Sequence, residues 1–157
     1  MKNICLILIL AFVVAASSSK AFGQATVRSF NITFATTGDD KDWNTQLRVR
    51  LVVNGQDVAS LFCCDQDHNI DHWKDHTTTD RTLILNNKNV TLAQLQNATL
   101  VIGMTAKGND TWIFIPTLRA KFNDGNPPVE WTWGETSLVS NNTEASKTFP
   151  IPPKIAE

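Results

Sequence analysis

The stretch LRVRLVVN at residues 47–54 decides the fold class. In it Leu47, Val49 and Leu51 alternate with charged arginines. A repeat of two places all the apolar side chains on one face of an extended strand, because successive side chains point to opposite faces. We therefore expect a strand with one buried face and one polar face.

The same alternation recurs along most of the chain, at residues 29–34, 99–104 and 112–122, and more weakly at 83–85, 130–133 and 148–151. Polar turns separate these segments, and only residues 91–96 favour a short helix, with Thr91 as its N-cap. Pro116 has no N–H, so its strand needs an edge or a bulge there. Short strands without crossover helices predict an all-β fold: an antiparallel β-sandwich of seven or eight strands with at most one short helix.

The N-terminal segment has the pattern of a secretory signal peptide. Lys2 precedes an apolar run, and small residues lead to a cleavage site after Gly23. We expect a secreted protein, extracellular or periplasmic, with no transmembrane segment in the mature chain. The expected division of the chain is a signal peptide at 1–23, one sandwich domain at 26–151 and an extended tail at 152–157.

Charge and cysteine content narrow the range of partners. The formal net charge is −1, which gives no basic field for nucleic acid. Cys63 and Cys64 are adjacent, and on a strand their side chains would point to opposite faces. We therefore expect two free thiols or one intermolecular pair in preference to a disulfide between these neighbours.

The connection between the first two strong strands is acidic. Asp39, Asp40 and Asp42 lie within four residues, and carboxylates that close repel one another unless a cation neutralises them. Ca²⁺ prefers several oxygen ligands on a flexible loop, which predicts a calcium site. The alternative is a solvated acidic turn, since Asp is an ordinary turn residue.

Two stretches resemble a known family. Thr37-Gly38-Asp39, followed after a short polar stretch by Thr45 and the strand at 47–51, resembles the opening of PLAT domains. Residues 98–114 resemble the penultimate strand, turn and Trp-led strand of that family. The resemblance implies a β-sandwich related to calcium-dependent lipid-binding sandwiches. It also implies that Asp39 and Asp42 bind Ca²⁺ and that the domain docks on lipid or on another protein.

All three histidines fall in one segment, each preceded by Asp. If the segment is helical, His68, His72 and His76 share one face and form a candidate site for Zn²⁺ or Cu²⁺. If it is a loop, Asp65 and Asp67 are the candidates to join the first acidic loop in one Ca²⁺ site. A solvated polar loop is the third reading.

Trp43 and Trp73 lie in polar loops and are candidate docking side chains, since an exposed Trp anchors at a lipid interface or presents a flat face to a sugar. The alternative is that each folds back over the end of the sandwich. Trp131 and Trp133 alternate onto one face, and their exposure would favour a carbohydrate-binding module.

We therefore expect a secreted, non-catalytic binding domain that docks on a lipid surface, a glycan or an extracellular protein through Ca²⁺-bound loops at one end. The alternatives are a carbohydrate-binding module with structural Ca²⁺ and a histidine-based metal-binding protein. Catalysis is disfavoured, because Ser60 lies in no Gly-x-Ser-x-Gly elbow and the proximity of Cys63 or Cys64 to His68 in sequence fixes no geometry.

Overall fold

The structure is a computed structural model that describes residues 24–64 and 73–153. The expected signal peptide therefore lies outside the described residues. Within them the chain forms nine strands and one short helix: β1 Val27–Gly38, β2 Gln46–Val53, β3 Gln56–Cys63, β4 Thr78–Leu85, α1 Leu92–Leu95, β5 Ala98–Thr105, β6 Asn109–Phe122, β7 Val129–Thr132, β8 Thr136–Asn141 and β9 Glu144–Pro150.

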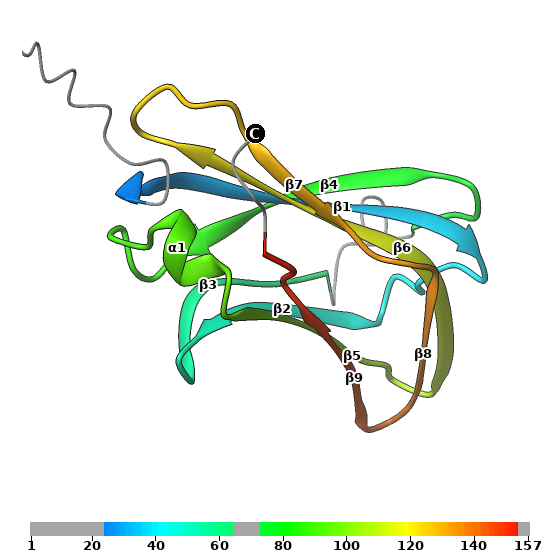
Figure 1. Cartoon of the computed structure of the whole chain (residues 1–157). Coiled ribbons are helices and arrows are strands. Elements are labelled where there is room, and N and C mark those ends of the chain that lie inside the picture. Colours follow the sequence, from blue (N-terminus) through cyan, green and yellow to red (C-terminus); the bar gives the residue numbers. More distant parts are fainter. Residues whose placement is uncertain (1–23, 65–72, 154–157) are drawn as a thin grey trace, which may run out of the picture.

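The strands form one curled antiparallel sheet in the order β7-β6-β1-β4-β3-β2-β5-β9, with β8 also paired to β6. The curl brings two layers face to face, one of β4, β1, β6 and β7 and the other of β3, β2, β5 and β9 (Figure 1). The predicted all-β, antiparallel and sandwich-like class is therefore confirmed. The strand count exceeds the expected seven or eight, because β3 and β8 are not among the segments predicted as strands.

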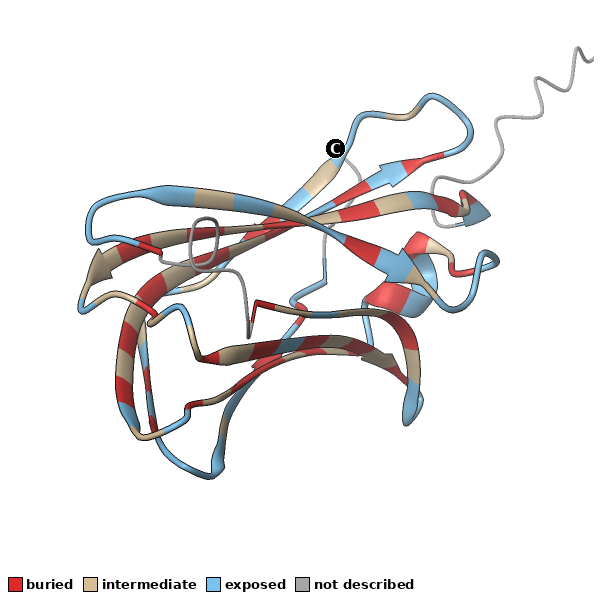
Figure 2. Ribbon diagram, turned by 180° about the vertical axis from the view of Figure 1, so that it is seen from behind, coloured by how far each residue is buried: buried red, intermediate tan, exposed pale blue. Residues whose placement is uncertain are grey.

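Alternating burial follows the sequence pattern. In β2 the apolar residues Leu47, Val49 and Leu51 are fully buried, whereas the arginines between them point outward. Figure 2 shows the same alternation of buried residues with intermediate or exposed ones along strands of both layers. Burial of each inner face removes apolar surface from water, which is the main driving force for folding.

Pro116 lies between the part of β6 that pairs with β8 and the part that pairs with β7. β8 pairs with residues up to Phe114 and β7 with residues from Thr117, so the two short strands flank the proline. The Pro116 carbonyl accepts a hydrogen bond of 3.2 Å from the Trp133 N–H. The missing proline N–H would face the same side, so its absence removes no bond of the β1–β6 ladder.

The predicted helix forms over a single turn, Leu92–Leu95. Thr91 is its N-cap, and the Thr91 and Gln94 side chains form a reciprocal capping box. Leu92 and Leu95 are the buried residues of this turn, which closes the end of the sandwich away from the acidic loop (Figure 1).

An aromatic cluster fills the other end of the core. Phe34 of β1 contacts Trp112 at 5.0 Å and Phe114 at 5.6 Å between ring centroids, and Trp112 stacks on Phe114 at 3.9 Å. The Trp112 indole N–H donates to the Thr36 hydroxyl at 3.1 Å, so its polar atom is satisfied inside the core.

Two tryptophans in and directly after β7 donate hydrogen bonds to the backbone at the end of β9 and just beyond it. The Trp131 indole N–H donates to the Pro152 carbonyl at 3.1 Å, and the Trp133 indole N–H donates to the Pro150 carbonyl at 3.0 Å. These bonds hold the start of the expected tail against the opposite layer. Its last residues, 154–157, lie outside the described part of the chain.

Across residues 24–64 and 73–153, no helix has both the length and the apolar character needed to cross a membrane.

Phe34→Ala is expected to lower the free energy of unfolding by about 3 to 5 kcal/mol, because it leaves a cavity at the centre of the aromatic cluster. Ile84→Ala is the control, since Ile84 is 70% exposed and its truncation should change stability by less than about 0.5 kcal/mol. Urea denaturation followed by Trp fluorescence measures both, and equal effects would contradict this assignment of the core.

Candidate functional site

The acidic connection between β1 and β2 is organised around a buried lysine. Lys41 has 0% exposure, and its ammonium donates to the carbonyls of Asp42 at 2.9 Å, Thr45 at 2.7 Å and Cys64 at 3.3 Å. An ammonium has three protons, so these carbonyls match its full donor capacity. A positive charge supplied by the chain itself therefore sits among backbone oxygens that would suit a metal cation.

Lys41 also joins the two ends of the segment at residues 65–72, which lies outside the described residues. Cys64, just before that segment, accepts from the Lys41 ammonium. Trp73, just after it, donates its backbone N–H to the Lys41 carbonyl at 3.3 Å, and its ring lies 5.3 Å from the ammonium. Both flanks therefore meet the first acidic loop at one end of the molecule, which we call the acidic pole (residues 39–45 with Asp110).

Trp73 is not a surface anchor, and its expected docking role is wrong. It is only 2% exposed and packs against Phe34 at 5.3 Å and Trp112 at 5.0 Å. The polar residues around Trp73 in the sequence suggested an exposed loop. In the structure Lys41 and Arg81 cover its ring, with cation-to-centroid distances of 5.3 and 5.4 Å. Its indole nitrogen is buried without a hydrogen-bond partner.

Asp110 is the residue of the acidic pole that the sequence reasoning missed. It lies in β6 and is almost buried, and its carboxylate accepts from the Thr45 hydroxyl and, at 3.2 Å, from the Asp42 backbone N–H. Burial raises the pKa of the Asp110 carboxyl above 3.8, although the hydrogen bonds from Thr45 and Asp42 oppose that rise. In the sequence Asp110 ends the stretch Gly-Asn-Asp, which is typical of a turn, and nothing in that stretch indicates a buried carboxylate.

The outer part of the acidic pole carries the remaining carboxylates and one aromatic ring. Asp39 is exposed, with a left-handed φ of 25°, and its carbonyl accepts from the Ile113 N–H at 3.1 Å. Asp40 and Asp42 are half-buried. Trp43 is 39% exposed, so of the two tryptophans proposed for docking it is the one available at the surface.

Among residues 24–64 and 73–153, no group of three or more His, Cys, Asp or Glu side chains is arranged to hold a metal ion. The proposed ligands Asp65 and Asp67, and the alternative ligands His68 and His72, lie outside those residues. His76 is described and exposed, with a left-handed φ of 58° just before β4.

Cys63 and Cys64 form a disulfide with each other, which corrects the expectation of free thiols or an intermolecular pair. That expectation assumed strand geometry for both residues. β3 ends at Cys63, and Cys64 has a φ of 79°, so the alternation of side chains stops between them. Neither sulfur is a thiolate nucleophile in this state.

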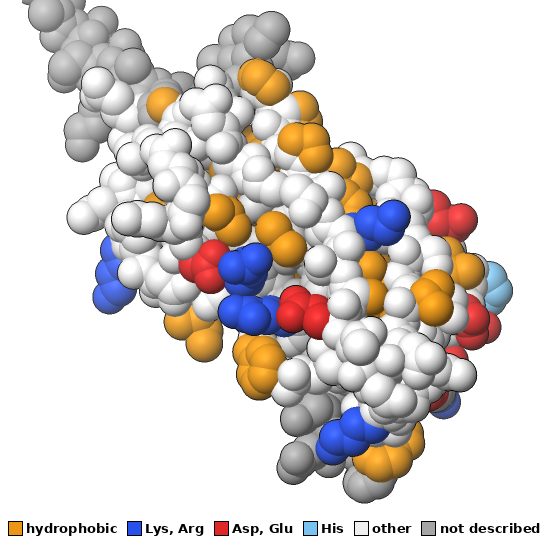
Figure 3. Space-filling view, turned by 90° about the horizontal axis from the view of Figure 1, so that it is seen from below, with side chains coloured by type: hydrophobic (Ala, Val, Ile, Leu, Met, Phe, Trp, Pro, Cys, Tyr) orange, Lys and Arg blue, Asp and Glu red, His pale blue; other side chains and the backbone are white. Residues whose placement is uncertain are grey.

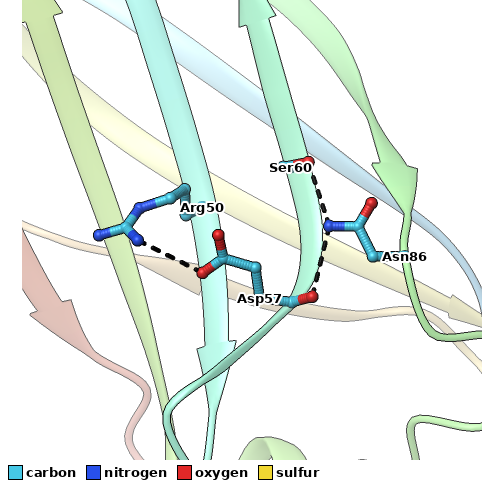
Figure 4. Close-up of polar contacts among 4 residues, drawn as sticks. All are labelled: Arg50, Asp57, Ser60 and Asn86. Carbon is cyan, nitrogen blue, oxygen red and sulfur yellow. Dashed lines mark hydrogen bonds and ion pairs between the residues drawn. The ribbon is translucent and has the colours of Figure 1, made fainter.

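Ser60 belongs to a structural hydrogen-bond cluster (Figure 4). The Asn86 amide donates to the Ser60 hydroxyl at 3.2 Å and to the Asp57 carbonyl at 3.3 Å, while the Asp57 carboxylate pairs with Arg50 at 3.5 Å. Ser60 pairs with Ile84, six residues along β4 from its start near His76. That separation is about 20 Å at 3.3 Å per residue, so His76 cannot serve Ser60 as a base.

The tryptophan platform expected of a carbohydrate-binding module is not formed. Trp131 is buried and Trp133 is half-buried, and both are engaged with the C-terminal strand.

Comparison of the chain with protein-family models, with curated proteins and with solved structures finds no match.

Asp110→Ala is expected to lower the free energy of unfolding by about 1 to 3 kcal/mol, because the Thr45 hydroxyl and the Asp42 N–H lose their buried acceptor. Urea denaturation of this variant and of wild type measures the loss.

Asp110→Asn keeps an acceptor oxygen and removes the charge. A folded-state pKa above 3.8 means that ionisation opposes folding, so this penalty is absent below pH 3.8 and grows as pH rises through the raised pKa. The stability of Asp110→Asn relative to wild type should therefore increase with pH in urea titrations at several pH values. A pH-independent difference would contradict the assignment.

Lys41→Met is expected to lower the free energy of unfolding by at least about 2 kcal/mol, since buried carbonyls lose their donor while the side chain keeps a similar length. Lys74→Met is the matched control, because Lys74 is exposed on the adjoining turn. Thermal and urea unfolding compare the two, and a Lys41→Met protein as stable as Lys74→Met would show that the ammonium is dispensable.

Proposed function

We propose that the protein is a secreted, non-catalytic binding domain whose acidic pole docks on an anionic lipid surface in a Ca²⁺-dependent manner. The observation that carries the proposal is the exposed side chain of Trp43 on an acidic loop whose backbone is fixed by hydrogen bonds. The backbone of Asp42, next to Trp43, is bonded to the Lys41 ammonium and to the Asp110 carboxylate, so the loop presents the ring without having to fold on contact.

In this proposal a cation bridges the outer carboxylates of the acidic pole and the lipid phosphates. Lys41 directs its charge inward to carbonyls, whereas Asp39 is exposed beside the half-buried Asp40 and Asp42. Carboxylates and lipid phosphates repel each other, and Ca²⁺ is bound by oxygen ligands of both kinds. In this proposal the chain contributes ligands from Asp39, Asp40, Asp42, Asp65 and Asp67.

In this proposal the cation does not have to order the loop. The described part of the loop is already joined to Cys64, β6 and Trp73 by hydrogen bonds. Ca²⁺ therefore acts at the outer carboxylates and the lipid headgroup, while Trp43 enters the interfacial region.

Two features support secretion. The signal-peptide pattern precedes the domain. The disulfide between Cys63 and Cys64 is of a kind that persists in oxidising compartments and is rare in the cytosol.

The test is cosedimentation of the mature protein with vesicles of phosphatidylcholine containing phosphatidylserine, in Ca²⁺ and in EGTA. We expect binding in Ca²⁺ alone, at least a tenfold weaker affinity for Trp43→Ala, and a similar loss for Asp39→Asn combined with Asp42→Asn. Asp124→Asn, in the exposed turn after β6 at the other end of the sandwich, should bind normally.

Three results would refute the proposal. The first is binding that persists in EGTA, and the second is equal losses in the Asp124→Asn control. The third is absence of binding to the vesicles in Ca²⁺, whatever else the protein binds.

A further inference from the structure

The outer face of the β4-β1-β6-β7 layer contains a polar groove. It has a volume of about 180 Å³ and is lined by seven residues from these four strands: Asn31, Thr33, Asp80, Thr117, Arg119, Lys121 and Glu130. The register explains the gathering, because Thr33 lies between Asp80 and Thr117, directly opposite both. Side chains opposite each other in antiparallel strands share a face.

Several groups in the polar groove have hydrogen-bond or ion-pair partners on neighbouring strands. The Thr33 hydroxyl donates to the Asp80 carboxylate, and the Arg119 guanidinium lies 3.3 Å from the Glu130 carboxylate. Beside them the Asn31 amide donates to Thr82 at 3.0 Å. Fixed side chains lose little rotamer freedom when a ligand arrives, which lowers the cost of binding.

The other outer face of the molecule has a different chemistry. Figure 3, viewed from the side of the β3-β2-β5-β9 layer, shows hydrophobic side chains lying among charged ones. Phe62 of β3 is 65% exposed on that layer, whereas the exposed Ile84 belongs to β4, the strand that also supplies Asp80 to the groove. Among the described residues that line the polar groove there is no aromatic or aliphatic side chain, so the groove differs from an ordinary mixed sheet surface.

The lining chemistry selects the class of ligand. Two carboxylates, Asp80 and Glu130, balance two cations, Arg119 and Lys121, so the groove has no net charge to favour an anion or a cation. Hydroxyl and amide groups add both donors and acceptors. The volume of 180 Å³ lies below the roughly 300 to 1,000 Å³ of sites for drug-sized molecules, which limits the ligand to about one ring at a time.

We propose that the polar groove binds a neutral carbohydrate, taking one sugar unit of a longer chain. Sugar hydroxyls both donate and accept hydrogen bonds, so a pyranose ring satisfies the Asp80 and Glu130 acceptors and the Arg119 and Asn31 donors together. Binding rests on hydrogen bonds without ring stacking. The site is separate from the acidic pole and needs neither Ca²⁺ nor Trp43.

The test is retardation of the mature protein in native gels containing a soluble β-glucan, xylan or galactomannan, run in EGTA. An oligosaccharide from the retarding polymer is then titrated calorimetrically. We expect retardation by at least one of the three polymers and at least a tenfold weaker affinity for Arg119→Ala and for Asp80→Asn.

Arg50→Ala is the matched control. Arg50 forms the equivalent cross-strand ion pair with Asp57, at 3.5 Å, on the other outer face (Figure 4). Its affinity for the oligosaccharide should stay within twofold of wild type, as should that of Trp43→Ala, and all variants should keep the wild-type melting temperature within a few degrees.

Absence of retardation by all three polymers would overturn the proposal, as would equal losses in Arg119→Ala and Arg50→Ala. Because every sugar experiment is run in EGTA, failure here is distinguishable from failure of lipid docking at the acidic pole.

Discussion

The arrangement of the acidic pole depends on one buried ammonium. Lys41 donates to carbonyls in its own loop and at the end of β3, while its backbone carbonyl receives the N–H of Trp73. A buried charge is tolerated only when its protons are all paired, and here the backbone supplies the acceptors. Three segments distant in sequence are therefore joined by a single residue.

This interaction couples the pole to the core. The ring of Trp73 lies under the Lys41 ammonium and packs in the aromatic cluster with Phe34 and Trp112. Asp110 adds a second tie, because its carboxylate accepts from the loop through Thr45 and Asp42. The acidic connection is thus tied to the rigid scaffold, as the proposed docking through Trp43 and the outer carboxylates requires.

The curled sheet separates two chemically different surfaces from that pole. The outer face of the β3-β2-β5-β9 layer carries the exposed Phe62, whereas that of the β4-β1-β6-β7 layer carries a charge-balanced polar groove. The proposed lipid and sugar contacts therefore use different parts of the scaffold, the connecting loops and the strand face. Each rests on side chains that neighbouring strands hold in position.

What the sequence alone determined is local. Alternation in β2 and β6, the Thr91 cap and the irregularity at Pro116 follow from side-chain periodicity and backbone chemistry, which a short window contains. It also pointed to the acidic loop and to Trp43. Only the tertiary structure decided that Trp73 is buried, that Cys63 pairs with Cys64, that Asp110 belongs to the pole and that Lys41 supplies its cation. Except for the cysteine pair, which depends on where β3 ends, these outcomes arise from contacts between residues far apart in the chain, and no local pattern encodes which segments the curl of a sheet brings together.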